Sequence, residues 1–256
     1  MNQSFYIGAV GAHQQLRRLN IHGNNIANVN TYGFKAEKSR FQALMYQNWQ
    51  GVEDELPMGV GTSLLMTSTD YSTGRVADTG RPLDYMIEGD GFFALADLAT
   101  GEVTFTRNGA FYMAEYLRPN GLTDPTTGEA MTEKVFCLSD GEGRFVLSQE
   151  GGLIEVTDYQ VEQPIGIFDY TNYDGMLQLN DTRYLPADKN GDLWLGTGTL
   201  RQGVLEQSNA DLAEELTKVI ESQRAYGLAL KMVQTSDEIT NTINNINTTI
   251  PIICTY

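Results

Sequence analysis

Apolar positions near both ends of the chain recur at alternating intervals of four and three residues, the spacing of a coiled-coil helix. The N-terminal positions are Phe5, Ala9, Ala12, Leu16, Leu19, Gly23 and Ile26, and the C-terminal positions are Leu212, Leu216, Val219, Gln223, Tyr226, Leu230 and Val233. The pattern predicts helices over residues 3–28 and 209–247, the second beginning at Ser208 or Asn209. Because so narrow an apolar seam would remain exposed to solvent on a lone helix, each helix requires a helical partner.

Short apolar runs separated by turn residues predict an all-β region from about residue 67 to residue 195. Glu88-Gly89-Asp90-Gly91 favours a hairpin turn between two such runs. Asn108-Gly109 favours a type I′ hairpin turn between the next two, since both residues accept positive φ. Further strands are expected at 135–138, 145–147, 154–156, 165–168 and 176–179.

These elements predict an α+β fold, in which long N- and C-terminal helices pair as a coiled-coil-like layer and enclose a central all-β domain. The regions are an N-terminal assembly helix and turn (1–35), an irregular or partly helical connector (36–66), a central β-rich domain (67–200), and a C-terminal assembly helix and tail (201–256). Within the connector, Ala36 to Gln47 could continue helically, while Pro57, Gly59 and Gly61 enforce irregular backbone.

Charge bears on the choice of partners. The chain has 256 residues and a formal net charge of −16, which argues against nucleic acid as a partner because phosphates recruit basic surfaces. Residues 1–40 carry five cations against Glu37 alone, a net charge of +4. Residues 205–240 carry seven carboxylates against three cations, a net charge of −4. The two terminal helices are therefore electrostatically complementary, which sets register and partner choice more than affinity.

The sequence gives little support for a catalytic or ligand-binding site of a known pattern. His13 and His22 are nine positions apart, about 180° around a helix at ~100° per residue, so they cannot share a metal ion on one helix. The sequence has neither a phosphate-binding loop nor a nucleophile elbow. We expect no catalytic residue, cofactor, metal ion or small-molecule substrate. A glycosidase stays open as an alternative, because opposed carboxylates such as Asp84, Glu88 and Asp90 need be close only in space.

Two further absences concern the membrane. The small apolar run from Phe5 to Ala12 has no basic region before it, so no cleavable signal is expected. No uninterrupted apolar stretch of ~18 residues is present to span a bilayer. The sequence therefore predicts either a cytoplasmic protein or one exported with its N-terminus intact.

Several motifs occur in a fixed order along the chain. They are Gly23-Asn24-Asn25-Ile26-Ala27-Asn28-Val29-Asn30-Thr31-Tyr32-Gly33-Phe34-Lys35, Arg81-Pro82-Leu83-Asp84, Gly89-Asp90-Gly91-Phe92-Phe93, Thr106-Arg107-Asn108-Gly109, Gly203-Val204-Leu205-Glu206-Gln207-Ser208-Asn209-Ala210-Asp211-Leu212 and Glu221-Ser222-Gln223-Arg224-Ala225-Tyr226. In this order they resemble the signatures of the bacterial flagellar rod and hook proteins. The resemblance covers nearly the whole chain.

The resemblance implies an axial component of the flagellum, exported through the flagellar type III apparatus without signal cleavage and polymerised into a helical tube. It places the protein in the basal body within the cell envelope. Its implied partners are copies of itself, homologous axial proteins and the export apparatus. Terminal helices form the inner layer of such tubes, and β-rich domains form the outer layer.

Two sets of residues follow from this interpretation. Those expected at the assembly interface, as buried knobs of the inner layer, are Leu16, Leu19, Ile26, Leu212, Leu216, Val219, Tyr226, Leu230 and Val233. Those expected in the signature turn are Asn24, Asn25, Asn28, Asn30, Thr31, Gly33, Phe34 and Lys35. The asparagines would satisfy backbone groups where the helix ends, and Gly33 would take a positive φ.

We further expect residues 1–30 and 209–256 to become helical only when neighbouring subunits arrive, since an uncovered stripe cannot offset the entropy of ordering. An intramolecular helical hairpin packed on the β domain is the alternative. Among paralogues, a rod subunit of the distal type is favoured, followed by a proximal rod or hook protein. A secreted β-rich binding module that oligomerises through terminal coiled coils is the interpretation from outside the family.

Overall fold

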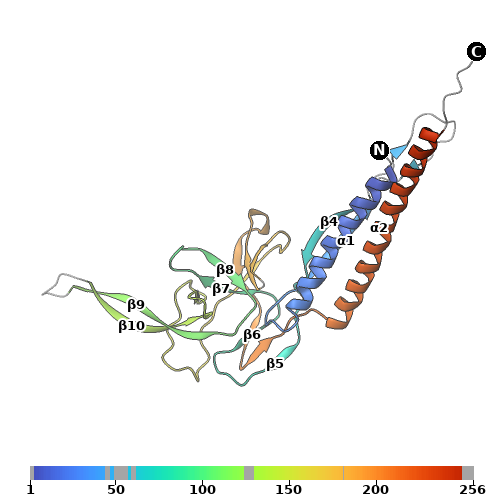
Figure 1. Ribbon diagram of the computed structural model, residues 1–256. Coiled ribbons are helices and arrows are strands. Elements are labelled where there is room, and N and C mark those ends of the chain that lie inside the picture. Colours follow the sequence, from blue (N-terminus) through green and yellow to red (C-terminus); the bar gives the residue numbers. More distant parts are fainter. Residues whose placement is uncertain are drawn as a thin grey trace, which may run out of the picture. The chain divides into compact units, whose positions relative to one another are not determined.

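The computed structural model describes residues 3–43, 47–48, 57–58, 62–123, 130–180 and 182–249 (Figure 1). Its long helices are α1 (Gln3–Ala27) and α2 (Leu212–Thr249). The other elements are β1 (Glu37–Ala43), β2 (Gln47–Asn48), β3 (Pro57–Met58), β4 (Thr62–Thr69), β5 (Val76–Asp78), β6 (Tyr85–Glu88), β7 (Phe92–Ala96), β8 (Val103–Thr106), β9 (Tyr112–Thr123), β10 (Ala130–Ser139), β11 (Phe145–Val146), β12 (Ile167–Tyr170), β13 (Leu177–Asn180), β14 (Arg183–Leu185), the 3-10 turn η1 (Asp188–Asn190), β15 (Leu193–Leu195), β16 (Thr199–Gln202) and β17 (Val204–Glu206). The predicted α+β class is confirmed.

The described residues group into two compact units. The helical unit draws its residues from 1–27, 37–68 and 211–256, and the β unit draws its residues from 28–36 and 69–210. The division into four regions made from the sequence stays a prediction.

In the helical unit, α1 and α2 lie side by side and run in opposite directions (Figure 1). The Asp211 side chain caps α2, because it accepts hydrogen bonds from the backbone N–H groups of Ala213 at 2.8 Å and Glu214 at 3.4 Å. The predicted start at Ser208 or Asn209 is therefore too early. The Ser208 hydroxyl accepts a backbone hydrogen bond before the helix begins.

The helical option for the connector is wrong where the structure describes it, because β1 is a strand paired with β4. The Asn25 side chain explains the difference. Its amide donates to the Glu37 carbonyl at 2.9 Å, and its oxygen accepts from the Glu37 N–H at 2.9 Å. Both backbone groups of Glu37 are thus engaged and unavailable to a helical ladder. Residues 44–46, 49–56 and 59–61 of the connector lie outside the described residues.

The β unit is built around a nine-stranded sheet whose main path runs β13-β14-β8-β7-β11-β10-β9. Strand β12 joins the sheet through β7 and carries β15 on its other side. Two smaller pairs, β6 with β16 and β5 with β17, link the start of the β unit to its end. The observed pairing is antiparallel in each of these ladders, which agrees with the predicted β-rich middle.

Both predicted hairpins are wrong. Strand β6 pairs with β16 rather than with β7, and β8 pairs with β7 and β14 while β9 pairs with β10. Gly109 does not take a positive φ; it instead lets two backbones approach, since its carbonyl accepts from the Tyr85 N–H at 3.0 Å and a Cβ would collide with the Tyr85 carbonyl. The predicted strand 154–156 is not a strand: within it, Glu155 makes an isolated bridge to Cys137.

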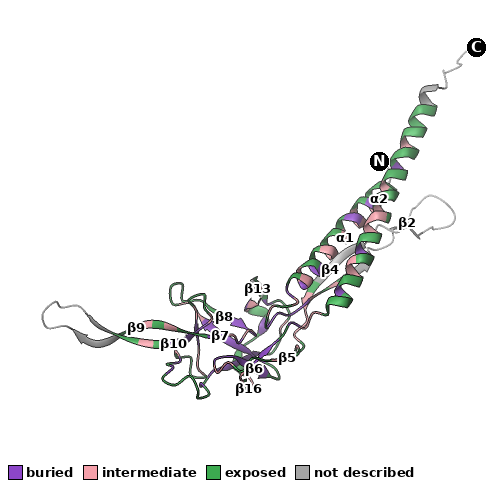
Figure 2. Cartoon of the chain, turned by 60° about the horizontal axis from the view of Figure 1, so that its bottom comes forward, coloured by how far each residue is buried: buried purple, intermediate pink, exposed green. Residues whose placement is uncertain are grey.

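Strand β7 divides the core of the β unit into two clusters. Phe93 and Leu95 point into one cluster, and Phe92 and Ala94 point into the other, as the alternation of side chains along a strand requires. Buried residues accordingly gather around β7 (Figure 2). The second cluster is aromatic: the Tyr184 ring lies 5.9 Å from that of Phe92. With both faces covered, β7 is continuously apolar rather than alternating.

Candidate assembly site

Small and polar side chains line the seam between α1 and α2. The buried residues are Gly8, Ala12, Ile21, His22 and Asn25 on α1, and Glu215, Ser222 and Ser236 on α2. Glycine at position 8 permits a close approach, because a Cβ there would lie 2.9 Å from Val233 Cγ2. The sequence contained a signal for this seam. Gly8 and His22 are fourteen positions apart, which is two heptads, and so are Ser222 and Ser236.

The predicted assembly residues therefore divide into two groups. Leu19, Ile26, Val219, Tyr226 and Val233 are half-buried. The remaining four, Leu16, Leu212, Leu216 and Leu230, stay 38–46% exposed. Their own chain does not cover these four. Several seam residues, such as His22, Glu215 and Ser222, lie one position before a residue of the predicted heptads, whereas Ala12 is itself one of the predicted positions. That all nine are buried between subunits stays a prediction.

A buried polar cluster joins the end of α1 to the start of α2. His22 Nδ1 lies 2.6 Å from Glu215 Oε2, and the Asn25 amide donates to the same oxygen at 3.2 Å. Lys218 Nζ donates to Oε1 at 3.1 Å. Burial alone raises the pKa of Glu215, but the hydrogen bonds from His22, Asn25 and Lys218 outweigh it and hold the pKa below its usual range. His13, by contrast, is exposed.

Six of the eight residues predicted for the signature turn lie in the β unit, directly after α1 ends, whereas Asn24 and Asn25 lie within α1 in the helical unit. Gly33 has φ = 71°, as the sequence predicted, and its N–H donates to the Glu206 carbonyl at 2.8 Å. The Thr31 hydroxyl donates to Asn28 Oδ1 at 3.0 Å, which closes the preceding turn. Asn30 is exposed, while Asn24 is half-buried. Gly33 thereby brings the N-terminal signature against the C-terminal one.

Beyond the turn, Phe34 and Lys35 are fully buried. Lys35 Nζ donates to Glu206 Oε1 at 2.6 Å and to the Ser72 carbonyl at 2.8 Å. Arg107 Nη1 lies 3.5 Å from Glu206 Oε2. Burial lowers the pKa of Lys35, while the Glu206 carboxylate opposes that shift.

Asn209 completes this junction between the two signatures. Its oxygen accepts a hydrogen bond from the Ala36 N–H at 2.8 Å, and its amide donates to the Asp70 carbonyl at 2.7 Å. Glu206 and Asn209 carry the contact from the C-terminal side; neither was predicted as a site residue, and Asn209 was expected only as a possible start of the second helix. Their place in the C-terminal motif was the available signal.

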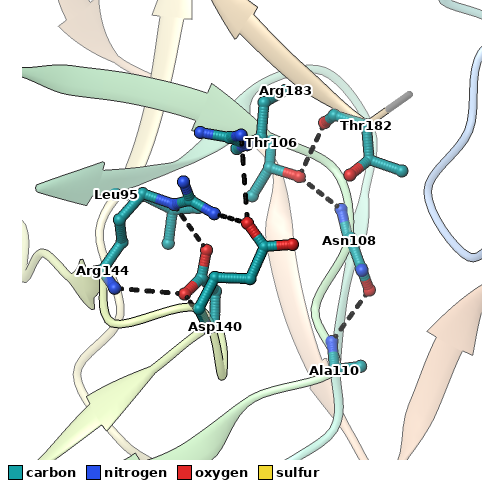
Figure 3. A pocket seen from close by; sticks show the side chains of 9 residues that line it. Leu95, Thr106, Asn108, Ala110, Asp140, Arg144, Thr182 and Arg183 are labelled. Atoms are coloured by element: carbon teal, nitrogen blue, oxygen red, sulfur yellow. Dashed lines mark hydrogen bonds and ion pairs between the residues drawn. The ribbon is translucent and has the colours of Figure 1, made fainter. Parts of the chain in front are cut away.

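A small polar cavity of about 60 Å³ lies elsewhere in the β unit (Figure 3). Arg144 Nε donates to Asp140 at 2.8 Å, and Arg183 lies 3.9 Å from Glu142. The Thr106 hydroxyl donates to the Thr182 carbonyl at 2.8 Å. Because the lining cations and carboxylates pair with one another, the cavity has no net charge to offer a ligand.

Other candidate sites take structural roles. Asp84 lies 3.4 Å from Arg81, and Glu88 lies 3.1 Å from Arg201, so these carboxylates form ion pairs. Over the described ranges, no cluster of three or more metal-ligating side chains occurs. Neither α1 nor α2, as far as the structure describes them, is apolar enough along its length to cross a bilayer.

Comparison with known proteins relates both ends of the chain to one family. A family model of flagella basal body rod proteins matches residues 5–35, and a model of the C-terminal region of flagellar basal body rod FlgEFG proteins matches residues 201–246. The flagellar basal-body rod protein FlgG of Buchnera aphidicola subsp. Schizaphis graminum is 31% identical over 93% of this chain and 97% of the relative. The chain belongs to the flagellar basal-body rod protein family.

Two further members of the rod family show the same extent of similarity. The FlgG protein of Bacillus subtilis is 31% identical over 96% of this chain and 99% of its own. The basal-body rod protein FlgF of Caulobacter vibrioides is 28% identical over 93% and 95%, respectively. The resemblance found in the sequence motifs is thus confirmed. The segments that match the rod-family models contain both Lys35 and Glu206, the ion pair of the junction.

Proposed function

We propose that the protein is a structural subunit of the flagellar basal-body rod that polymerises through its terminal helices. The observation that carries this proposal is the set of large apolar side chains that the helix pair leaves exposed, among them Leu16, Leu212, Leu216 and Leu230. Exposed apolar stripes of this kind mark interaction surfaces. Contacts of one surface with a different surface on the next identical subunit generate an open filament when the rotation between subunits does not close a ring.

The relatives support a rod subunit over a hook subunit, since the FlgG and FlgF proteins are both named rod proteins. We propose the distal rod type and keep the proximal type as its alternative. Locating the subunit in a reconstruction of the basal body distinguishes them. Export through the type III apparatus with an uncleaved N-terminus, assembly with homologous axial proteins, and the absence of enzymatic activity belong to the same proposal.

The pairing of α1 with α2 inside one chain favours an intramolecular helical hairpin, and the packing of that hairpin on the β domain stays a prediction. Gain of helix on assembly stays a prediction for residues 1–30 and 209–256. Circular dichroism of the monomer and of the polymer tests it, and equal helix content in the two would exclude it.

Electron microscopy of the purified protein tests the proposed function. We expect tubes from the wild type, none from Leu216→Asp, and tubes from the control Thr217→Asp, which adds the same charge at the neighbouring exposed position. Discrete trimers or tetramers would instead indicate a binding module. A peptidoglycan-hydrolysis assay on the same preparation tests the glycosidase alternative, and measurable turnover would contradict a purely structural role.

A further inference from the structure

Helix α2 extends well beyond its partner α1. Glu215 lies against His22 near one end of the pair, and Val233 lies against Gly8 near the other. Since α1 begins five positions before Gly8, its first residue falls near residue 238 of α2. Helix α2 continues to Thr249, so about 11 residues, roughly 16 Å at ~1.5 Å per residue, form an overhang past the start of α1. Figure 2 colours most of this part of α2, up to residue 246, as exposed.

The overhang carries an apolar stripe. Ile239, Ile243 and Ile246 follow one another at intervals of four and three and are each 52–54% exposed. Ile243 also occupies the same heptad position as Ser222 and Ser236, which face α1. The overhang stripe therefore continues the seam between α1 and α2 past the point where α1 begins.

A second apolar stripe lies at the other end of the same helix. Leu212, Leu216 and Ile220 follow one another at intervals of four and are 45–51% exposed. Leu216 and Ile243 are 27 positions apart, which places them on opposite sides of the helix at ~100° per residue. The two stripes of one straight helix thus cannot meet each other.

We propose that the overhang stripe of one copy, Ile239-Ile243-Ile246, docks on the stripe Leu212-Leu216-Ile220 of the next copy. This contact rests on the proposed function and specifies which surfaces carry it. Stripes at opposite ends and on opposite sides of one helix repeat from copy to copy without closing, as a filament requires. The carboxylates of Asp237 and Glu238 border the overhang and oppose an anionic lipid surface as its occupant.

Disulfide trapping tests the contact in the full chain. One preparation carries Ile243→Cys and another carries Leu216→Cys, both with Cys254→Ser, while the native Cys137 is buried. Mixing the two preparations makes any cross-link intermolecular. After assembly and mild oxidation we expect several times more disulfide-linked dimer than with Asn244→Cys, a control on the neighbouring exposed position. Cross-linking no greater than in this control would overturn the contact.

A pair of introduced opposite charges gives an independent measurement. Ile243→Asp should raise the critical concentration for tube formation about tenfold. Adding Leu216→Lys to the same chain should lower the critical concentration most of the way back to the wild-type value. Tubes from the wild type without the trapped dimer would reject this contact yet leave the rod function standing. Failure of the wild type to form tubes would contradict both this contact and the rod function. The stripe would bind lipid instead if the wild type sedimented with phosphatidylglycerol vesicles, Ile243→Asp did not, and tube formation were the same in both.

Discussion

Substitution of Gly33 by alanine should destabilise the β unit more than an ordinary glycine replacement in the same backbone conformation. Gly33 has φ = 71°, a region that costs an L-residue roughly 1–2 kcal/mol. A Cβ at this position would also lie 2.5 Å from the Arg107 carbonyl carbon and 2.7 Å from Asn108 Cα. Carbon atoms pack at about 3.5–4.0 Å, so the backbone itself must move.

Steric overpacking of this kind typically costs about 1–3 kcal/mol, so the total loss expected for Gly33→Ala is about 2–5 kcal/mol. Gly101 supplies the matched control. Its φ is 73°, and no atom lies within 4 Å of the position that a Cβ would take. Gly101→Ala should therefore lose only the conformational cost of about 1–2 kcal/mol.

Urea unfolding of the full chain, followed by tryptophan fluorescence, measures both losses. Equal losses for the two variants would refute the steric argument. Gly33→Asn refines the test, because asparagine tolerates the left-handed conformation but keeps the collision. It should fall between Gly101→Ala and Gly33→Ala. Gly33→Val should in addition impair assembly, and unaltered motility would count against the role of the turn.

Three further predictions concern residues other than Gly33. Glu206→Gln leaves two buried cations without their carboxylate and should cost about 3–5 kcal/mol in thermal unfolding. The pKa of Glu215 is depressed in the folded protein, so its stabilisation is complete above the unfolded value of 4.5 and is lost as pH falls through the folded pKa. The melting temperature should therefore drop in acid, and less so for Glu215→Gln. Gly11→Ala should stabilise α1 by about 1 kcal/mol, whereas Gly8→Ala should not, because its Cβ would meet Val233.

Each of these has a contradicting outcome. Glu206→Gln melting at the wild-type temperature would mean that the buried cations need no carboxylate. An identical acid response in Glu215→Gln would assign the acid transition to other carboxylates. Equal stabilisation by the two glycine replacements would show that the helices do not approach closely at Gly8.

Local pattern predicted the elements of this fold better than it predicted their partners. The heptad spacing located both helices, but it weighted large apolar side chains and so missed the seam of Gly8 and Ser222, where small size allows close approach. Turn residues located strand ends, yet β6 pairs with β16 across more than a hundred residues, which no turn signal encodes. Gly33 was predicted correctly because a positive φ is a local property. Its partner Glu206 was missed because the contact is not local.

The junction of Lys35 and Glu206 has a consequence for how the chain tolerates change in length. These two residues are 171 positions apart in sequence, yet their side chains are in contact. The segment between them therefore begins and ends at the same place in the β unit. Gly74 also reaches this point, because its N–H donates to Glu206 at 2.7 Å. Insertions or deletions between Gly74 and Glu206 would lengthen or shorten a segment whose two ends remain in contact. The terminal signatures can therefore remain constant while the intervening β unit diverges.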